Sequence, residues 1–346
     1  MGAVTAWVTS SCADLDLLVT SPGERTHDRP WSYAVVHDVR NPDGTNGQVW
    51  FKANGIGTRH EPGLVAVLGS LVPDLVPEVL AVDTDRAWSL TRHAGPTWRS
   101  AIPVPDQWPL WGDLLQRYAE AQLSLAAHRP DLLAAGLPER SPATLPSQAG
   151  GLVAELALLG DESGGLPAAE ARALEARLPA YGQWCRELSG AGIPWTIQHD
   201  DLHASNVCSG GTAGGRASGT TTIASTTNNS TTMNSATHTA ARSRVIDWGD
   251  ASFGHPFGTM LATLRSIARH GGCEIDDPRV QRVRDAYLEP FSVHAPRQEL
   301  LALVKVAQRI GWVTRALSWS AALAGSPTEV HRRYDFPIRG WLRELL

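Results

Sequence analysis

Two segments far apart in the sequence carry oxygen-bearing side chains in an unusual arrangement. The first is the run HDDLHASN at residues 199–206, in which Asp201 and Asn206 are five residues apart. The second is VIDWGD at residues 245–250, where Asp247 follows an apolar pair that predicts a short strand. Two carboxylates and an amide are ligands that Mg²⁺ prefers when its other ligands are waters and phosphate oxygens. The sequence therefore predicts a Mg²⁺ site at which these segments meet.

The two segments spell H-x-D-x-x-x-x-N and then I-D-W, a pattern that resembles the aminoglycoside phosphotransferase family of kinase-like enzymes. Protein kinases have His-Arg-Asp and Asp-Phe-Gly at these places, whereas Asp200 and Trp248 follow the small-molecule style. The resemblance extends more weakly over residues 17–322. It implies an α+β, two-lobed protein-kinase-like fold with ATP and Mg²⁺ as cofactors. It also implies transfer of the γ-phosphate to a hydroxyl of an aminoglycoside, an amino sugar or a related metabolite.

The resemblance implies roles for the polar residues of the two segments. Asp201 is the expected base or orienting group, which aims the acceptor hydroxyl at the γ-phosphorus. Asn206 and Asp247 are the expected metal ligands, because kinases use an Asn and a second Asp to hold Mg²⁺. His199 is expected to support the loop through backbone hydrogen bonds. Asp and Asn are also common turn residues, but the complete pattern beside a strand favours the catalytic interpretation.

Lys52 is one of only two lysines in the chain, the other being Lys305. It lies in VWFKA, residues 49–53, where apolar neighbours predict a strand. In a chain that otherwise uses Arg, it favours a place where a compact charge contacts α- and β-phosphate oxygens. The alternative is a surface lysine whose stem covers apolar area. Glu61 is its expected ion-pair partner, although an acid at a helix start also interacts with the helix dipole; Glu78 is the second choice.

The nucleotide-covering segment is the least regular part of the pattern. The first hairpin contains no G-x-G-x-x-G, so we predict that Ser32 and nearby backbone N–H groups cover the phosphates. Arg92, His93 and Ala94 resemble the segment that links the lobes and reads the adenine edge. An ordinary linker would have a similar sequence.

The acceptor site is predicted from five residues. Asp200 adds negative charge beside Asp201, which suits an amino-bearing acceptor, although a carboxylate that faces solvent would look the same. His203 is placed to contact the acceptor or the waters of the metal, or to serve a structural role. The late helix carries a stripe of aromatic and cationic side chains that suits a sugar or a polycyclic ring; core packing is the alternative. These stripe residues are Trp312, Arg315 and Trp319.

Residues 1–93 predict a nucleotide-binding lobe of short antiparallel strands and one helix. The strands are expected at 16–20, 32–40, 48–53, 78–83 and 87–91, and the helix at 61–72. Residues 94–346 predict a helical lobe that contains the catalytic loop and the acceptor site. Its helices are expected at 111–128, 167–188, 256–270, 278–288 and 298–323. The tract 209–243 predicts a disordered insertion at a hairpin tip, because its Ser, Thr, Gly and Asn residues bury little apolar surface.

Composition limits the other classes of function. The formal net charge is -5 and the pI is about 6.2, so nothing predicts a nucleic-acid partner. The four cysteines are widely spaced and predict isolated thiols rather than a zinc site. The first cationic residue is Arg25 and no apolar run reaches the length of a membrane span. We expect a cytoplasmic protein without membrane contact, and the oligomeric state stays open.

A second hypothesis is a catalytically inactive kinase-like module that binds a nucleotide or another ligand. The long insertion and the missing glycine loop favour it, and so does His255, which stands where the family often has Asp. The intact set of Lys52, Asp201, Asn206 and Asp247 favours the enzyme. A protein kinase is disfavoured by Trp248 and by the lack of an A-P-E segment.

Overall fold

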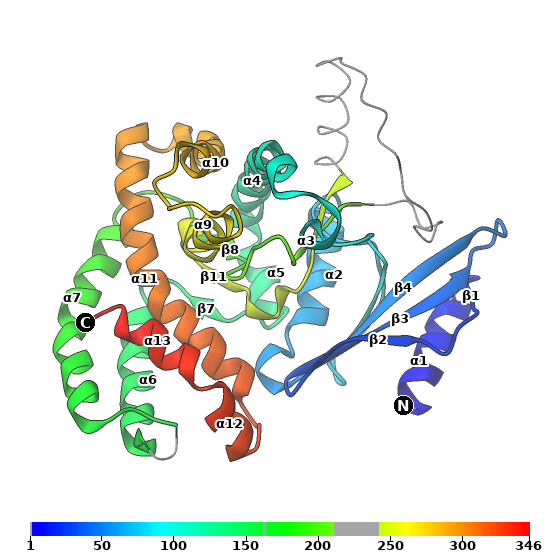
Figure 1. Ribbon diagram of the computed structural model, residues 1–346, viewed down its shortest axis with the longest axis horizontal. Coiled ribbons are helices and arrows are strands. Elements are labelled where there is room, and N and C mark those ends of the chain that lie inside the picture. Colours follow the sequence, from blue (N-terminus) through cyan, green and yellow to red (C-terminus); the bar gives the residue numbers. More distant parts are fainter. Residues whose placement is uncertain (1, 162–163, 211–241) are drawn as a thin grey trace.

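The structure is a computed structural model and describes residues 2–161, 164–210 and 242–346. Figure 1 shows two lobes, a curled antiparallel sheet with few helices and a larger part that is mainly helical. This α+β, two-lobed arrangement confirms the predicted fold class. Among the described residues, no helix is both long and apolar enough to cross a membrane.

The sheet of the N-terminal lobe follows the order β1-β3-β4-β6-β5, and β2 pairs with the other part of β3. Its strands are β1 Leu18–Val19, β2 Glu24–Arg29, β3 Ser32–Arg40, β4 Asn46–Asn54, β5 Val79–Asp83 and β6 Trp88–Arg92. Five of these agree with the predicted strands. The turn between β3 and β4 is closed by Asp43, whose carboxylate accepts from the Thr45 backbone N–H at 2.9 Å. The β4–β6 pairing places Lys52 opposite Ser89, in the middle of the sheet.

Helix α2 (Glu61–Leu71) lies between the sheet and the helical lobe and begins with Pro62 in its first turn. A short helix, η1 (Ile56–Thr58), precedes it. Leu64 and Leu68 are fully buried on one face of α2. Because Glu61 precedes them by one and two turns, the same face carries its carboxylate toward the sheet.

The helical lobe contains more helices than the sequence predicts. Its helices are α3 Trp98–Ala101, α4 Val104–Leu125, α5 Arg129–Ala134, α6 Leu145–Leu159, α7 Ala168–Ser189, α9 Thr259–His270, α10 Pro278–Leu288, α11 Arg297–Leu323, α12 Thr328–Tyr334 and α13 Phe336–Arg343, with short turns η2 Ala126–His128, η4 Trp248–Asp250, η5 Pro256–Gly258 and η6 Glu289–Val293. Helix α4 begins seven residues earlier than predicted and contains Pro109 in its interior. The prediction of α10 is confirmed residue for residue.

Two small sheets hold the polar loops. The strands β7 Glu139–Arg140, β8 Thr196–Gln198 and β11 Ser252–Gly254 form a three-stranded sheet beneath the catalytic loop. The strands β9 Val207–Cys208 and β10 Arg244–Val245 form an antiparallel pair. This pair confirms the predicted hairpin base, and the predicted disordered insertion lies largely outside the described residues. Gly210 donates to the Ala94 carbonyl at 2.9 Å, which ties the hairpin base to the segment between the lobes.

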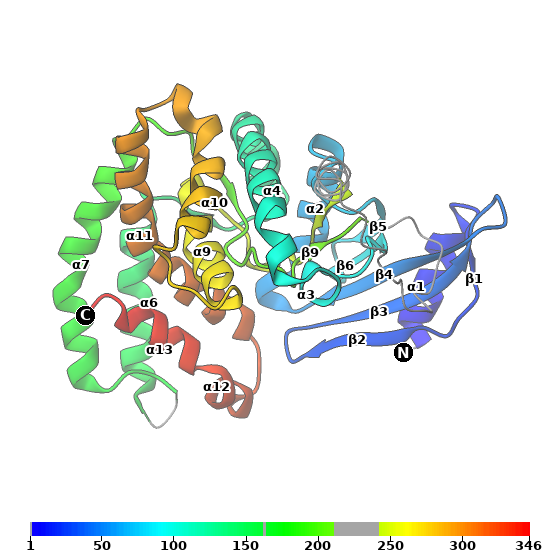
Figure 2. The same ribbon diagram turned by 45° about the horizontal axis from the view of Figure 1, so that its top comes forward.

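Aromatic rings join the two lobes where the tip of the β2–β3 hairpin meets the helical lobe. Trp31 lies at the tip of the β2–β3 hairpin, and its ring is 5.8 Å from that of Trp319 and 5.1 Å from that of Tyr334, both edge-on. Figure 2 shows the hairpin tip beside the end of α11 and α12. We call Trp31, Trp319 and Tyr334 the aromatic clasp. It fixes the hairpin that covers the cleft against the helical lobe.

Candidate active site

The catalytic loop leaves β8 through His199, which is fully buried. Its backbone N–H donates to the Tyr118 hydroxyl at 2.9 Å, its Nε2 lies 2.9 Å from the Ile246 carbonyl, and its Nδ1 accepts from the Asp201 N–H at 3.3 Å. Burial lowers the pKa of His199, which favours the neutral ring that these contacts require. The residue therefore joins the two polar segments and orients the loop.

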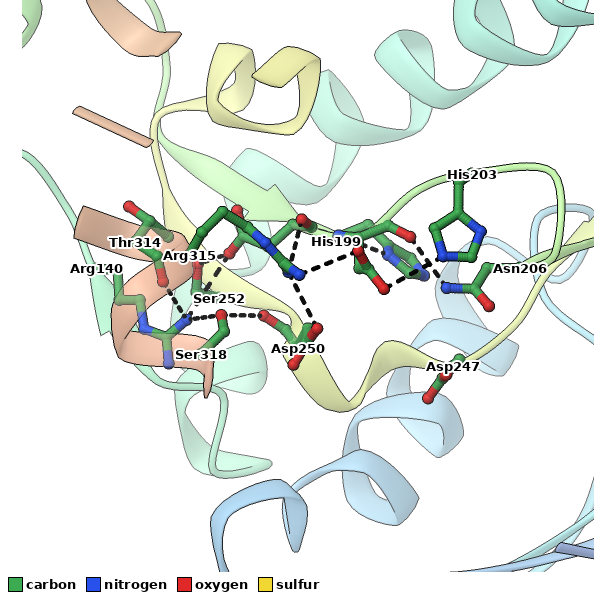
Figure 3. A network of polar contacts seen from close by, with 12 residues as sticks. Arg140, His199, His203, Asn206, Asp247, Asp250, Ser252, Thr314, Arg315 and Ser318 are labelled. Carbon is green, nitrogen blue, oxygen red and sulfur yellow. Dashed lines mark hydrogen bonds and ion pairs between the residues drawn. The ribbon is translucent and has the colours of Figure 1, made fainter. Parts of the chain in front are cut away.

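Asp200 and Asp247 both have left-handed backbones, with φ of 63° and 64°. Such a conformation is uncommon for residues other than glycine and is frequent at functional sites. At Asp200 it turns consecutive side chains apart: Asp200 faces the interior and Asp201 faces the cleft. Asn206 donates from Nδ2 to the Asp201 carbonyl at 3.0 Å, which closes the loop (Figure 3).

Lys52, Glu61 and Asp247 form one cluster of charges. The Lys52 Nζ lies 2.5 Å from Glu61 Oε2 and 2.5 Å from Asp247 Oδ1. The other oxygen of Glu61, Oε1, accepts from the Trp248 N–H at 2.9 Å. Burial alone would lower the pKa of Lys52, but the Asp247 and Glu61 carboxylates outweigh it and raise that pKa. The predicted pairing of Lys52 with Glu61 is present, and Glu78 instead lies 3.4 Å from Arg92.

A cleft of about 420 Å³ lies between the lobes and brings most of the predicted residues together. Its lining includes Lys52, Glu61, Arg92, His93, Ala94, Asp201, His203, Asn206 and Asp247. Ser32 does not line it; the Ser32 Oγ lies 3.0 Å from His27 Nε2, and His27 lines the cleft instead. Alternation along β3 places Ser32 on the same face as Ala34, which lines the cleft. The predicted contact of Ser32 with the phosphates therefore stays a prediction.

The donors of the cleft fit a Mg²⁺ ion bound together with phosphates. Asn206 and Asp247 both line the cleft, and the bond from Asn206 Nδ2 to the loop leaves its carbonyl oxygen as the metal-binding atom. Figure 3 shows Asp247 across from Asn206 and His203. Among the described residues no group of three His, Cys, Asp or Glu side chains could hold a metal. A kinase site does not require one, because Mg²⁺ binds through one or two carboxylates plus substrate phosphates and water.

Each oxygen of the Asp201 carboxylate lies near a basic side chain. Its Oδ1 lies 3.1 Å from Arg315 Nη2 and its Oδ2 lies 3.4 Å from His203 Nε2. Burial would raise the pKa of Asp201, but Arg315 and His203 outweigh it and hold that pKa well below its usual range. His203 lies beside Asp201 and lines the cleft, and its position near the acceptor stays a prediction.

Two predicted acceptor residues face away from the cleft, and these predictions are corrected. The Asp200 side chain is 2% exposed; its carboxylate accepts from Ser252 Oγ at 2.6 Å and lies 4.0 Å from Arg140. The left-handed backbone of Asp200 is the physical reason. Trp312 packs edge-on against Trp184 of α7, with ring centroids 6.5 Å apart, so core packing explains it.

The other two members of the late stripe lie one turn apart on α11. Arg315 is buried and directed at Asp201, and Trp319 belongs to the aromatic clasp. Arg315 contacts Asp201 and Trp319 contacts Trp31, so the contacts of both are with protein groups. The stripe therefore reaches the site through Asp201 and the hairpin tip.

The sequence interpretation did not single out Trp50 or Asp250. Trp50 lines the cleft and its ring is 5.7 Å from that of His93, with an angle of 26° between the planes. Alternation along β4 places Trp50 on the same face as Lys52, so this signal was available. Asp250 accepts from Arg315 Nη1 at 3.0 Å. Nothing local in the sequence indicates this contact, because the partners are 65 residues apart.

No family model and no curated protein matches this sequence. Solved structures do match. A macrolide 2'-phosphotransferase from Brachybacterium faecium is 15% identical with a TM-score of 0.51, and the alignment covers 94% of this chain and 99% of that one. An ethanolamine kinase from Plasmodium vivax is 12% identical with a TM-score of 0.58, covering 99% and 86%. A choline kinase from Streptococcus pneumoniae is 12% identical with a TM-score of 0.56, covering 99% of each chain.

These likenesses show the fold over 94 to 99% of the chain. It is the fold that the resemblance of the sequence motifs implied. The chain has the two-lobed, kinase-like fold of small-molecule phosphotransferases.

Proposed function

We propose that the protein is a small-molecule kinase that moves the γ-phosphate of ATP to a hydroxyl group. The observation that carries this proposal is the single ammonium of Lys52 held 2.5 Å from both Glu61 and Asp247. A structural ion pair needs one carboxylate, whereas kinases align a lysine, its acidic partner and the metal-binding Asp in one cleft. The lobes are proposed to divide at His93 and Ala94, which line that cleft.

The nucleotide has a defined place in this cleft. Lys52 contacts the α- and β-phosphate oxygens, and Mg²⁺, when bound by Asn206 and Asp247, neutralises phosphate charge. The Trp50 indole, stacked beside His93, offers a flat surface for the base. Base–aromatic stacking contributes about 1 to 3 kcal/mol in other nucleotide sites. The glycine-free hairpin covers the phosphates through Thr26, His27 and Arg29, which line the cleft.

Transfer follows an in-line path in one step. The acceptor oxygen forms a bond to the γ-phosphorus while the bond from that phosphorus to the β,γ-bridging oxygen breaks, and ADP takes the electron pair. The hydroxyl proton passes to Asp201, which lies at the cleft beside Asn206. A carboxylate whose pKa is held low is a weak base. Its main contribution is therefore orientation of the hydroxyl, as expected for a loose transition state.

The acceptor is a small hydroxylated molecule. The structural neighbours are named for macrolides, ethanolamine and choline, so the fold alone does not choose among acceptors. Acidic groups at the cleft, Asp201 and Asp247, together with a negative net charge suit an acceptor that carries an amine.

The test is ADP release coupled to acceptor phosphorylation, followed by ³¹P NMR over a panel of macrolides, aminoglycosides, amino sugars and amino alcohols. Asp201→Asn should lower kcat by about 100-fold or more while ATP binding persists, since it removes the orienting charge and keeps the shape. Asp106→Asn, an exposed change on α4, is the matched control. Mg²⁺-dependent ATP binding without turnover on any acceptor would instead identify an inactive nucleotide-binding module.

A further inference from the structure

Arg315 connects the catalytic loop to the turn that follows the metal-binding Asp. It lies on α11, and the residue is 6% exposed. Nη2 is 3.1 Å from Asp201 Oδ1, and Nη1 is 3.0 Å from Asp250 Oδ2. Nη1 also donates to the Asp200 backbone carbonyl at 2.9 Å. One side chain therefore contacts three acidic residues from two separate segments (Figure 3).

The contact with the Asp200 carbonyl occurs where the backbone is strained. Left-handed backbone is unfavourable at a residue other than glycine, because the Cβ crowds the following carbonyl oxygen. This conformation points Asp201 into the cleft while Asp200 points inward. A hydrogen bond from Arg315 to that carbonyl stabilises the conformation on which the direction of Asp201 depends.

The part of α11 that carries Arg315 is itself held by contacts with β7 and with the Asp250 backbone. Arg140 reaches α11 from β7, and its Nη1 lies 2.5 Å from Ser318 Oγ and 3.4 Å from the Thr314 carbonyl. Ser318 in turn donates toward the Asp250 carbonyl at 3.5 Å. A side chain supported in this way from a helix positions its partner more accurately than one on a loop. Arg315 and Asp250 are thus fixed relative to each other before any substrate binds.

Burial defines how Arg315 acts. Its Nη1 and Nη2 atoms face carboxylates and a carbonyl of the protein, so an acceptor meets Asp201 first. We propose that Arg315 is a positioning residue that sets the direction of the Asp201 carboxylate, with Asp250 as the anchor of the guanidinium. This inference rests on the proposed kinase activity. It also replaces the acceptor-binding role that the sequence suggested for Arg315.

The first arm of the test is kinetic. Arg315→Met should lower kcat about 10- to 100-fold, the usual effect of losing a group that orients a reacting side chain. The dissociation constant for ATP and the KM for the acceptor should change by less than about 2-fold, since Arg315 contacts neither in this arrangement. Arg315→Lys should recover only part of the loss, because an ammonium lacks the planar fork. Arg309→Met, an exposed change on the same helix, should leave kcat unchanged.

The second arm separates positioning from folding. Added guanidinium ion should restore part of the kcat of Arg315→Ala, and Asp250→Asn should reproduce a weaker form of the kcat defect. Wild-type kcat in Arg315→Met would overturn the proposal. The proposal would also be overturned if the loss of kcat came with a comparable loss of ATP affinity and a lower melting temperature, and if guanidinium gave no rescue.

The third arm does not depend on activity. A crystal structure of Arg315→Met should show the Asp201 carboxylate turned away from the place it has in the wild type. An unmoved carboxylate overturns the inference even if the enzyme is active. A wild-type protein that phosphorylates no acceptor counts against the proposed function, and the direction of Asp201 in the variant still decides the role of Arg315.

Discussion

Lys52 lies between the carboxylates of Glu61 and Asp247, and its positive charge offsets the repulsion between them. Glu61 is almost wholly buried, and burial raises its pKa while Lys52 opposes that shift. Asp247 is more open, with 48% of its side chain exposed. The ammonium between them favours the ionised form of both acids. The arrangement therefore stabilises the contact between the lobes, in addition to the phosphate-binding role proposed for Lys52.

Replacement of Lys52 should reveal both roles. Lys52→Met should lower the free energy of unfolding by about 3 to 5 kcal/mol, because Glu61 is left buried without its cation. It should also reduce ATP affinity. Urea denaturation and ATP titration measure the two effects. Lys52→Met combined with Glu61→Gln should recover part of the stability and none of the ATP affinity, and Lys305→Met, an exposed change on α11, should affect neither.

Asp200 should make stability depend on pH. Burial raises its pKa to about 7 in the folded protein, whereas an unfolded Asp titrates near 3.9. Because the folded pKa is raised, the stabilisation that this proton gives is fully present below about pH 4 and is lost as pH rises from there through about 7. Between these pH values the free energy of unfolding falls by up to about 1.4 kcal/mol per pH unit.

Asp200→Asn should remove this slope, because the amide keeps the shape of the side chain and cannot ionise. The difference in melting temperature between pH 5 and pH 8 should shrink in the variant. The exposed change Glu175→Gln should preserve the wild-type difference. An unchanged slope in Asp200→Asn would show that Arg140 and Ser252 already keep the carboxylate ionised at pH 5.

The site residues that the sequence predicted well are those with fixed spacing. Asp201 and Asn206 share one loop, and Asp247 follows a strand that pairs beside it, so local geometry brings them to one cleft. Asp200 could not be placed in this way. Its direction depends on a φ of 63°, which neighbouring residues do not reveal. For Arg315 the helix and the face were predictable, but the partner beneath that face was not, since it comes from tertiary packing.

At the scale of elements, α1 (Gly2–Ala13) and β2 were not predicted. Helix α1 mixes small and polar residues with Val4, Trp7 and Val8 and has weak amphipathic character, and it is stabilised by contact with the face of the sheet opposite the cleft. There Trp7 packs edge-on against Phe51 at 5.8 Å and Trp88 at 5.7 Å. Strand β2 is almost entirely polar and exposed, and its pairing with β3 defines it. Pattern fails in both cases because the partner element decides the structure.

Helix α1 should contribute stability to the N-terminal lobe without entering the chemistry. Trp7→Ala should destabilise the protein by about 3 kcal/mol, the lower end of the range for truncating a packed aromatic side chain. The kcat of the folded fraction should be unchanged, because the helix lies on the face opposite the cleft. Thermal unfolding and active-site titration measure the two quantities. Thr9→Ala, an exposed change in the same helix, should leave both unchanged.

At the scale of the whole molecule, the lobes are joined at the cleft and again at the aromatic clasp. Near the clasp, Gly57 of η1 lies so close to α11 that a Cβ there would fall 1.6 Å from the Ala321 carbonyl oxygen. The N-terminal lobe thus contacts α11 through both the hairpin tip and η1. The fold class was predictable from the sequence. The aromatic clasp was not predictable, because it joins Trp31 to residues that lie about 300 positions later in the sequence.

Loss of the clasp should speed nucleotide exchange. Trp31→Ala removes two edge-on ring contacts, each worth about 0.5 to 1.5 kcal/mol beyond the buried area. The hairpin should then open more often, so the dissociation rate of ADP should rise several-fold while Asp201 remains in place. Stopped-flow release of a fluorescent ADP analogue measures the rate. Trp341→Ala, on α13, is the control, and an unchanged rate in Trp31→Ala would show that the hairpin does not limit release.

The aromatic clasp should also let the rate of product release change without a change in the phosphate-transfer step. A flexible glycine loop can open without breaking such contacts. The β2–β3 hairpin must first separate the Trp31 ring from the two rings that it meets edge-on. A change of one ring, from indole to phenyl for example, would alter how long the product stays without altering the phosphate-binding groups. Substitutions at position 31, 319 or 334 should therefore change the rate of product release and leave the choice of acceptor unchanged.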